Sequence, residues 1–155
     1  MAHCLKLAEN CQVSPTAFCV GSILFLPASS SAYPALRNSF SCFNHDDTPA
    51  GLILAEGYSR QIPGNTHAEA NALTNFRTKY ADLVKVGHPG HHAMDEGTST
   101  CVSVPAIHDV LKETECFATL EPCSVRTSGR PSCALDLVRA GVRAVYLVGV
   151  YHSYM

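Results

Sequence analysis

The stretch that decides the fold is TLEPCSVRTSGRPSC, residues 119–133, in which one cysteine follows a proline and a second cysteine ends the stretch. The apolar residues that lead into it predict a short strand over 116–120. The spacing of apolar residues after it predicts a helix over 132–140, and a β-rich run predicts a further strand over 144–150. A strand, a helix and a strand in this order indicate a crossover between parallel strands.

The first third of the sequence predicts one helix and a pair of strands. Residues 2–11 carry apolar side chains on one helical face. The apolar runs 18–26 and 51–58 predict two buried strands, the second a hairpin partner of the first. Between them, residues 27–49 are rich in Ser, Pro, Asn and Asp, which predicts a long surface loop.

A further helix is expected over 66–80, with Asn65 or Thr66 as its N-cap and His67 in its first turn. The Gly- and Pro-containing run 86–100 indicates an irregular insertion, and a short helix is expected after it, over 104–111. The role of this insertion, which spans about 81–114, is left open by the sequence.

The alternation of strands and helices predicts an α/β protein: a three-layer α/β/α sandwich with a mixed central sheet, folded as a single domain over 1–155. A length of 155 residues with 46% hydrophobic composition suits one core. The balance of 11 Lys+Arg against 13 Asp+Glu gives a net charge of -2 without a basic run. Polymeric nucleic acid is therefore not an expected partner.

The start of the chain lacks the apolar segment of a secretory signal, and its longest apolar run, 17–26, is too short to span a membrane. We therefore expect a soluble, cytoplasmic protein without a membrane partner. The eight cysteines are irregularly spaced. In a reducing compartment such thiols tend to be buried or bound to metal.

His67, Cys123 and Cys133 form the predicted metal site, with one Zn²⁺ per chain. One imidazole and two thiolates fill three corners of a tetrahedral zinc site, and the open fourth corner is the mark of a catalytic centre. Cys123 follows a predicted strand and Cys133 lies at the start of a predicted helix, and a helix N-terminus and a dication both favour the thiolate form.

Glu69 is the predicted catalytic residue. It lies two positions after His67, so the two side chains do not share a helical face, and its carboxylate can reach a water on the metal. There it would take a proton from zinc-bound water, leaving hydroxide, and pass it first to a substrate nitrogen and then to the leaving amine.

His67-Ala68-Glu69 with Pro122-Cys123 resembles the H-x-E and P-C pattern of the zinc deaminases, whose second cysteine commonly follows after two residues. Nine residues intervene here. The runs over 119–124, 129–133 and 57–69 resemble the fungal type of the riboflavin-biosynthesis pyrimidine deaminases, a branch of the cytidine deaminase superfamily. The resemblance implies hydrolytic deamination of a 2,5-diamino-6-(ribosyl- or ribitylamino)pyrimidinone 5'-phosphate, with the sugar left open.

Four residues beside the motifs are candidate substrate contacts. Arg126 and Arg130 lie in the loop between the two cysteines, where a planar guanidinium suits a phosphate group. For each of them, phosphate contact and a solvated loop remain open. Asn65 and Ser124 are placed to hydrogen-bond the substrate's ring or sugar.

Two alternatives remain beside this hypothesis: a deaminase of a nucleoside, an antibiotic or a tRNA base, and a non-catalytic zinc-stabilised interaction domain. A second metal cluster at His88, His91 and His92 competes with simple solvation of a Gly/Pro loop. The other cysteines are expected to be small core or surface residues. Because the sequence stops just after its last predicted strand, either the sheet is one strand short or a partner subunit covers its edge, and we expect a homo-oligomer, a dimer.

Overall fold

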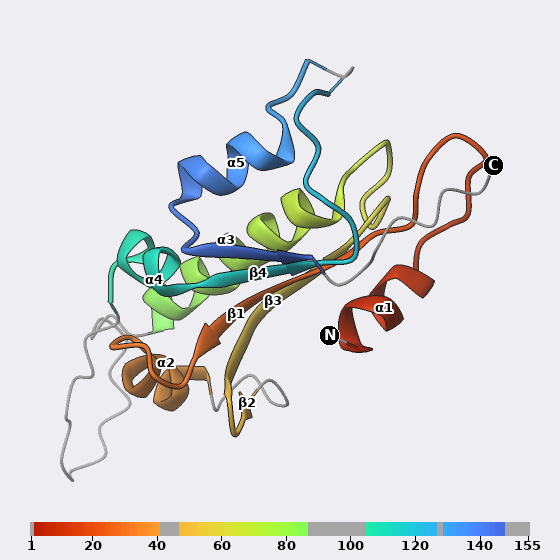
Figure 1. Cartoon of the computed structure of the whole chain (residues 1–155). Coiled ribbons are helices and arrows are strands. Elements are labelled where there is room, and N and C mark those ends of the chain that lie inside the picture. The colour runs from red at the N-terminus through yellow and green to blue at the C-terminus, as the bar shows by residue number, and fades with distance from the viewer. Residues whose placement is uncertain (1, 41–46, 87–104, 127–128, 148–155) are drawn as a thin grey trace, which may run out of the picture.

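The computed structural model describes residues 2–40, 47–86, 105–126 and 129–147, which form a mixed sheet with helices on both of its faces (Figure 1). The histidine cluster at 88–92 and the predicted insertion over 86–100, apart from its first residue, lie outside the described residues, as do Cys42 and Cys101. Within the described part, no helix is both long enough and apolar enough to cross a membrane. The elements in chain order are α1 (Ala2–Glu9), β1 (Gly21–Pro27), α2 (Tyr33–Phe40), β2 (Asp47–Thr48), β3 (Gly51–Tyr58), α3 (Ala68–Val86), α4 (Ile107–Glu113), β4 (Glu115–Ala118), α5 (Cys133–Ala140) and β5 (Ala144–Leu147).

The strands are arranged in the order β2-β3-β1-β4-β5. β1 pairs antiparallel with both β3 and β4, whereas β4 pairs parallel with β5. The predicted hairpin of the first two long strands and the parallel pairing of the last two are confirmed. The crossover through α3 also joins strands that run in the same direction, but β1 lies between β3 and β4 and separates them.

Helices cover both faces of the sheet, as predicted. The larger core joins Leu24 of β1, Leu54 of β3 and Phe76 of α3, all fully buried, to side chains of α4 and α5. On the opposite face α1 buries Cys4 and Leu7 against the sheet. The α/β class and the mixed central sheet are therefore confirmed.

Two glycines let the helices approach the sheet closely. A Cβ on Gly57 of β3 would lie 2.3 Å from the backbone oxygen of Ala68 and 2.5 Å from the nitrogen of Ala72 in α3. A Cβ on Gly21 of β1 would lie 2.1 Å from the oxygen of Cys4 in α1. Real Cβ atoms do not approach backbone atoms this closely, so glycine is required where each helix crosses its strand. At Gly57 this contact presses the start of α3 onto the end of β3.

The prediction of a loop over 27–49 is wrong in part, because α2 and β2 lie within it. Pro34 is the second residue of α2, and proline is tolerated in the first helical turn, where its missing N–H has no helical partner. The Oγ of Ser30 accepts a hydrogen bond from the nitrogen of Ala32 just before the helix, and Leu36 is fully buried. Burial of this one leucine against the sheet outweighs a local composition that is typical of a loop.

The start of α3 also differs from the prediction. The helix begins at Ala68, and the carbonyl of His67 accepts the first helical bond, from the nitrogen of Asn71 at 3.0 Å. His67 therefore lies at the cap position rather than in the first turn. Thr66, one of the two predicted caps, instead donates from Oγ1 to the carbonyl of Ile62 and accepts from the amide of Asn71.

Candidate active site and metal centre

The predicted site residues meet at one edge of the sheet. β3 and β4 both run antiparallel to β1, so their carboxyl ends lie at the same edge, where α3 and α5 begin. In α/β proteins this edge is the usual place for ligands. His67 immediately precedes α3, and Cys133 is the first residue of α5.

His67, Cys123 and Cys133 lie close enough to share one ion, since their ligand atoms are all within 4.8 Å of one another. The Nδ1 atom of His67 is 3.5 Å from the Sγ atom of each cysteine. Zinc bonds of about 2.3 Å to sulfur and about 2.0–2.1 Å to nitrogen, at the tetrahedral angle, place these atoms about 3.6 Å apart. The three side chains therefore fit a zinc ion as they stand.

The two cysteines are held together by the start of α5. Ser132 caps this helix by accepting a hydrogen bond from the nitrogen of Leu135. The nitrogen of Cys133 donates to the Sγ of Cys123 at 3.4 Å, and the nitrogen of Ala134 donates to the carbonyl of Cys123 at 3.2 Å. The first turn of α5 thus positions both sulfur ligands, which is how a nine-residue separation still yields one site.

The surroundings of these ligand atoms favour their uncharged forms. Burial, and then the nearby Glu69 carboxylate, raise the pKa of Cys133 far above its ordinary value. Burial and the Arg126 guanidinium lower the pKa of His67, which favours its neutral imidazole. A neutral imidazole has a free nitrogen lone pair and can bind a metal ion, which agrees with the distances.

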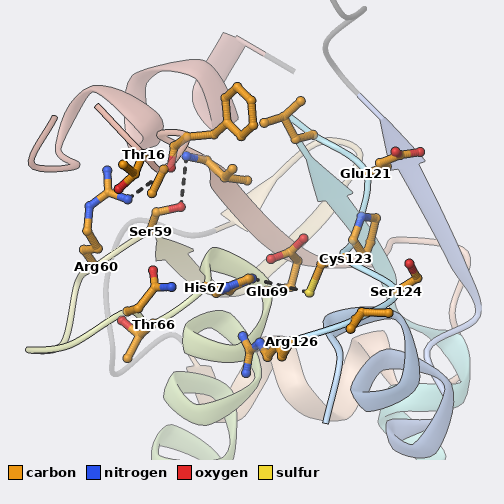
Figure 2. A pocket seen from close by; sticks show the side chains of 17 residues that line it. Thr16, Ser59, Arg60, Thr66, His67, Glu69, Glu121, Cys123, Ser124 and Arg126 are labelled. Atoms are coloured by element: carbon orange, nitrogen blue, oxygen red, sulfur yellow. Dashed lines mark hydrogen bonds between the residues drawn. The ribbon is translucent and has the colours of Figure 1, made fainter. Parts of the chain in front are cut away.

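Glu69 lies in the first turn of α3 with only 3% of its surface exposed. Burial raises the pKa of its carboxyl group, while a hydrogen bond with Cys133 and the charge of Arg126 act in the opposite direction. Figure 2 shows its carboxyl group beside His67 and Cys123. We call His67, Glu69, Cys123 and Cys133 the metal floor.

A pocket of about 580 Å³ opens over the metal floor, lined by residues from four segments, 16–20, 59–60, 65–69 and 120–126 (Figure 2). Three of the four predicted substrate contacts, Asn65, Ser124 and Arg126, line it. Arg130 is exposed and is not among its lining residues. The structure therefore brings Arg126, and not Arg130, to the site.

Arg126 approaches the metal floor directly. Its guanidinium donates to the Sγ of Cys133 at 3.3 Å. Its Nε is buried and has no hydrogen-bond partner among the described residues. A buried donor without a partner is costly, so this atom is available to a ligand in the pocket.

The opposite side of the pocket was not predicted from the sequence. The segment 11–20 precedes β1, and Arg60 follows β3; we call them together the Arg60 wall. Arg60 donates to the carbonyls of Gln12 and Phe18 and to the sulfur atoms of Cys11 and Cys19. The predicted strand over 18–26 begins only at Gly21, because residues 18 and 20 line the pocket instead.

Asn71 of α3 is a second residue whose role the sequence did not reveal. It is 3% exposed, and its side-chain amide donates to the carbonyl of Tyr58 at 2.8 Å and to the Oγ1 of Thr66 at 3.1 Å. These bonds tie the end of β3 to the segment that carries His67. An asparagine inside a helix pattern gives no sign of such partners, because both lie outside the helix.

The fold and the donor set together define an α/β protein with a mixed sheet and a His-Cys-Cys group that could hold a metal ion. A solved structure of Aspergillus oryzae Rib2 deaminase superposes with a TM-score of 0.59 at 23% identity, covering 94% of this chain and 68% of that one. A second structure of that enzyme, in complex with DARIPP, gives a TM-score of 0.58, also at 23% identity, covering 94% of this chain and 67% of that one.

In sequence the chain is similar to a diaminohydroxyphosphoribosylamino-pyrimidine deaminase of Schizosaccharomyces pombe, to which it is 27% identical over 147 residues. The match covers 95% of this chain but only 24% of that protein, so the chain spans about a quarter of its relative's length. No family model matches the chain. The resemblance predicted from the sequence is confirmed.

Proposed function

We propose that the chain is a zinc-dependent hydrolase that deaminates 2,5-diamino-6-(ribosyl- or ribitylamino)pyrimidinone 5'-phosphate in riboflavin biosynthesis. One observation carries the proposal: the His67 Nδ1 lies 3.5 Å from both cysteine sulfur atoms, with Glu69 buried beside them in the same pocket. The likeness to Rib2 deaminase and to the S. pombe deaminase supports the choice of substrate.

In this mechanism His67, Cys123 and Cys133 would hold the zinc ion. Bound there, the ion supplies activation of a water molecule by lowering its pKa toward neutrality. Glu69 accepts a proton on its carboxylate as water adds to the amine-bearing ring carbon, and donates it to the adjacent ring nitrogen. The carboxylate then takes the proton of the new hydroxyl group and carries it to the amine, so the carbonyl forms as the C–N bond breaks and ammonia leaves.

The buried position of Glu69 suits this role. Burial raises the pKa of its carboxyl group, which favours the protonated form that donates to the substrate. Arg126, which lines the pocket and whose Nε has no hydrogen-bond partner among the described residues, donates to the substrate in this proposal. Asn65 and Ser124 line the same pocket and contact the ring or the sugar.

The test is ammonia release from zinc-loaded protein given the ribosyl and ribityl substrates separately, with cytidine and adenosine as competing substrate classes. We expect release from one or both pyrimidinone phosphates and little from the nucleosides. Faster release from a nucleoside would favour the alternative deaminase. No release from any of them, with zinc content and fold intact, would contradict deaminase activity.

We also propose that two copies associate. Among the described residues β5 is one of the two edge strands of the sheet, and its Val145, Tyr146 and Leu147 are 40%, 42% and 49% exposed. Val138 of α5, beside them on a shallow apolar pocket, is 74% exposed. Sedimentation equilibrium should report a dimer, and Val138→Glu should shift the equilibrium toward the monomer.

The cytoplasmic location stays part of this proposal, and the six described cysteines, all free thiols, agree with it.

A further inference from the structure

Two of the cysteines that the metal site does not use lie together in the Arg60 wall. Cys11 follows α1 and is buried, and Cys19 precedes β1 and is half-buried. The chain between them turns back on itself, with an antiparallel bridge between Ser14 and Ala17. This hairpin-like turn brings its two ends, and with them the two cysteines, close to each other.

The side chains confirm this proximity. One guanidinium nitrogen of Arg60, NH2, donates to the Sγ of Cys11 at 2.7 Å and to the Sγ of Cys19 at 3.4 Å. The Sγ of Cys19 also lies 3.7 Å from the backbone carbonyl of Cys11. Two sulfur atoms that share one nitrogen in this way are at most about 6 Å apart, within reach of a disulfide after a small side-chain adjustment.

The backbone of Arg60, which contacts both cysteines, is strained. Its φ angle is 60°, a left-handed conformation that non-glycine residues rarely adopt, and its nitrogen donates to the carbonyl of Thr66. Such strain persists where surrounding contacts hold the residue in place. Arg60 also has the carbonyls of Gln12 and Phe18 as acceptors, so its clamp on the turn does not depend on the two thiols alone.

We propose that Cys11 and Cys19 are a redox modification site, at which a reversible disulfide closes the turn that forms one wall of the pocket. The oxidant is a low-molecular-weight disulfide such as oxidised glutathione. The more exposed Cys19 attacks it as thiolate, forming a mixed disulfide and releasing one glutathione thiolate. Cys11, after losing its proton, then attacks the Sγ of Cys19 and releases the second. Two electrons and two protons pass from the protein to two molecules of glutathione.

The surroundings of Cys11 suit the second step rather than the first. Burial, and then the neighbouring Cys19, raise the pKa of Cys11 to about 11, against the lowering effect of Arg60. A thiol with such a pKa is seldom ionised at neutral pH, so Cys11 reacts slowly with an oxidant in solution. It reacts readily only once Cys19, beside it, carries the glutathione. The two cysteines therefore stay reduced until Cys19 has reacted with the oxidant.

The turn between the cysteines is also the pocket wall, since Thr16, Ala17 and Phe18 line the cavity above Glu69. Figure 2 shows Thr16 and Arg60 together on the side of the pocket away from Cys123. A disulfide across this turn would restrict the wall without touching the metal floor. The proposed site is thus separate from the zinc ligands although it borders the same cavity.

The test equilibrates the zinc-loaded protein in glutathione buffers of rising oxidised fraction, traps free thiols with an alkylating agent in denaturant so that buried thiols also react, and maps chymotryptic peptides by mass. Chymotrypsin cleaves after Phe18, which separates the two cysteines, so their disulfide appears as two joined peptides. We expect alkylation of Cys11 and Cys19 to be lost together, and to return together on addition of dithiothreitol. The Cys4→Ala variant, which lacks the buried thiol of α1, should behave in the same way.

Two results would overturn the proposal. One is alkylation of both cysteines at every buffer ratio in the folded protein. The other is a disulfide that joins either of them to a different cysteine. The Cys19→Ser variant should leave Cys11 alkylated throughout, whereas the Cys11→Ser variant should accumulate the mixed disulfide of Cys19 with glutathione, seen as a peptide mass. Because the readout is a peptide mass, it does not depend on the deaminase activity proposed above.

Discussion

The metal floor and the Arg60 wall face each other across one pocket, yet they are built in different ways. The metal floor joins two short motifs, one at the start of α3 and one between β4 and the first residue of α5, which the fold brings together across 56 to 66 residues. The Arg60 wall is a turn held by an arginine that is 41 to 49 residues away in sequence. Both regions depend on long-range contacts, but only the metal floor is made of motifs that can be recognised in the sequence.

Replacing Glu69 by glutamine is the most severe test of the metal floor. The amide keeps the size of the side chain but cannot move protons, so we expect kcat for ammonia release to fall about 10²- to 10⁴-fold. Zinc content and thermal stability should stay near those of the parent. Glu9→Gln, an exposed carboxylate at the end of α1, serves as the control and should be fully active. Full activity of Glu69→Gln would remove the proton-transfer role.

Replacing Cys123 by serine removes a ligand rather than a proton carrier. Loss of a group that hydrogen-bonds to a metal ligand usually lowers metal affinity roughly 10- to 100-fold. We expect loss of the ligand itself to lower zinc affinity by more than this. The free energy of unfolding should fall with it, since metal binding and folding are coupled. Metal analysis after dialysis measures the first effect. Cys19→Ser, which removes a thiol from the Arg60 wall, should retain one zinc per chain, and its loss of zinc would show that the two regions are not independent.

Replacing Arg60 tests the Arg60 wall. Arg60→Ala removes the bonds to the turn but keeps a side chain at φ 60°, and we expect it to cost about 1–3 kcal/mol of stability. Arg60→Gly loses the same bonds while relieving the strain, so it should be less destabilising by about 1 kcal/mol. Urea denaturation measures both. Arg139→Ala, an exposed arginine of α5, should change stability by less than about 0.5 kcal/mol. Equal losses for Arg60→Ala and Arg60→Gly would show that the strain has no energetic weight.

The smallest expected effect concerns the start of α5. Ser132→Ala removes the side-chain oxygen that accepts from Leu135, and should cost about 1 kcal/mol. Ser132→Asp should retain most of this stability, since aspartate also caps helices. Because the first turn of α5 positions Cys123 and Cys133, we expect zinc affinity to follow the same order as stability, which titration with a competing chelator measures. An unchanged zinc affinity in Ser132→Ala would show that the cap supports the helix alone.

Much of the fold was predictable because its signals are local. The strand over 51–58 matches β3 residue for residue, and the capped helix over 132–140 differs from α5 only by its N-cap. The helix α2 was missed because its Tyr33-Pro34 start is typical of a loop, and only burial of Leu36 makes it a helix. The place of β1 between β3 and β4 was also not predictable, since pairing across 90 residues leaves no periodic sign in the sequence.

The sequence by itself determined the chemistry: His67, Glu69, Cys123 and Cys133 are of residue types that suit zinc and proton transfer, and they lie at positions where elements begin or end. Only the tertiary structure decided which groups surround that chemistry. It brings Arg126 to the metal floor and leaves Arg130 exposed, and it places Arg60 against the turn that precedes β1. The physical reason is that a ligand set follows from side-chain chemistry, whereas a pocket wall follows from contacts between segments that the fold alone brings together.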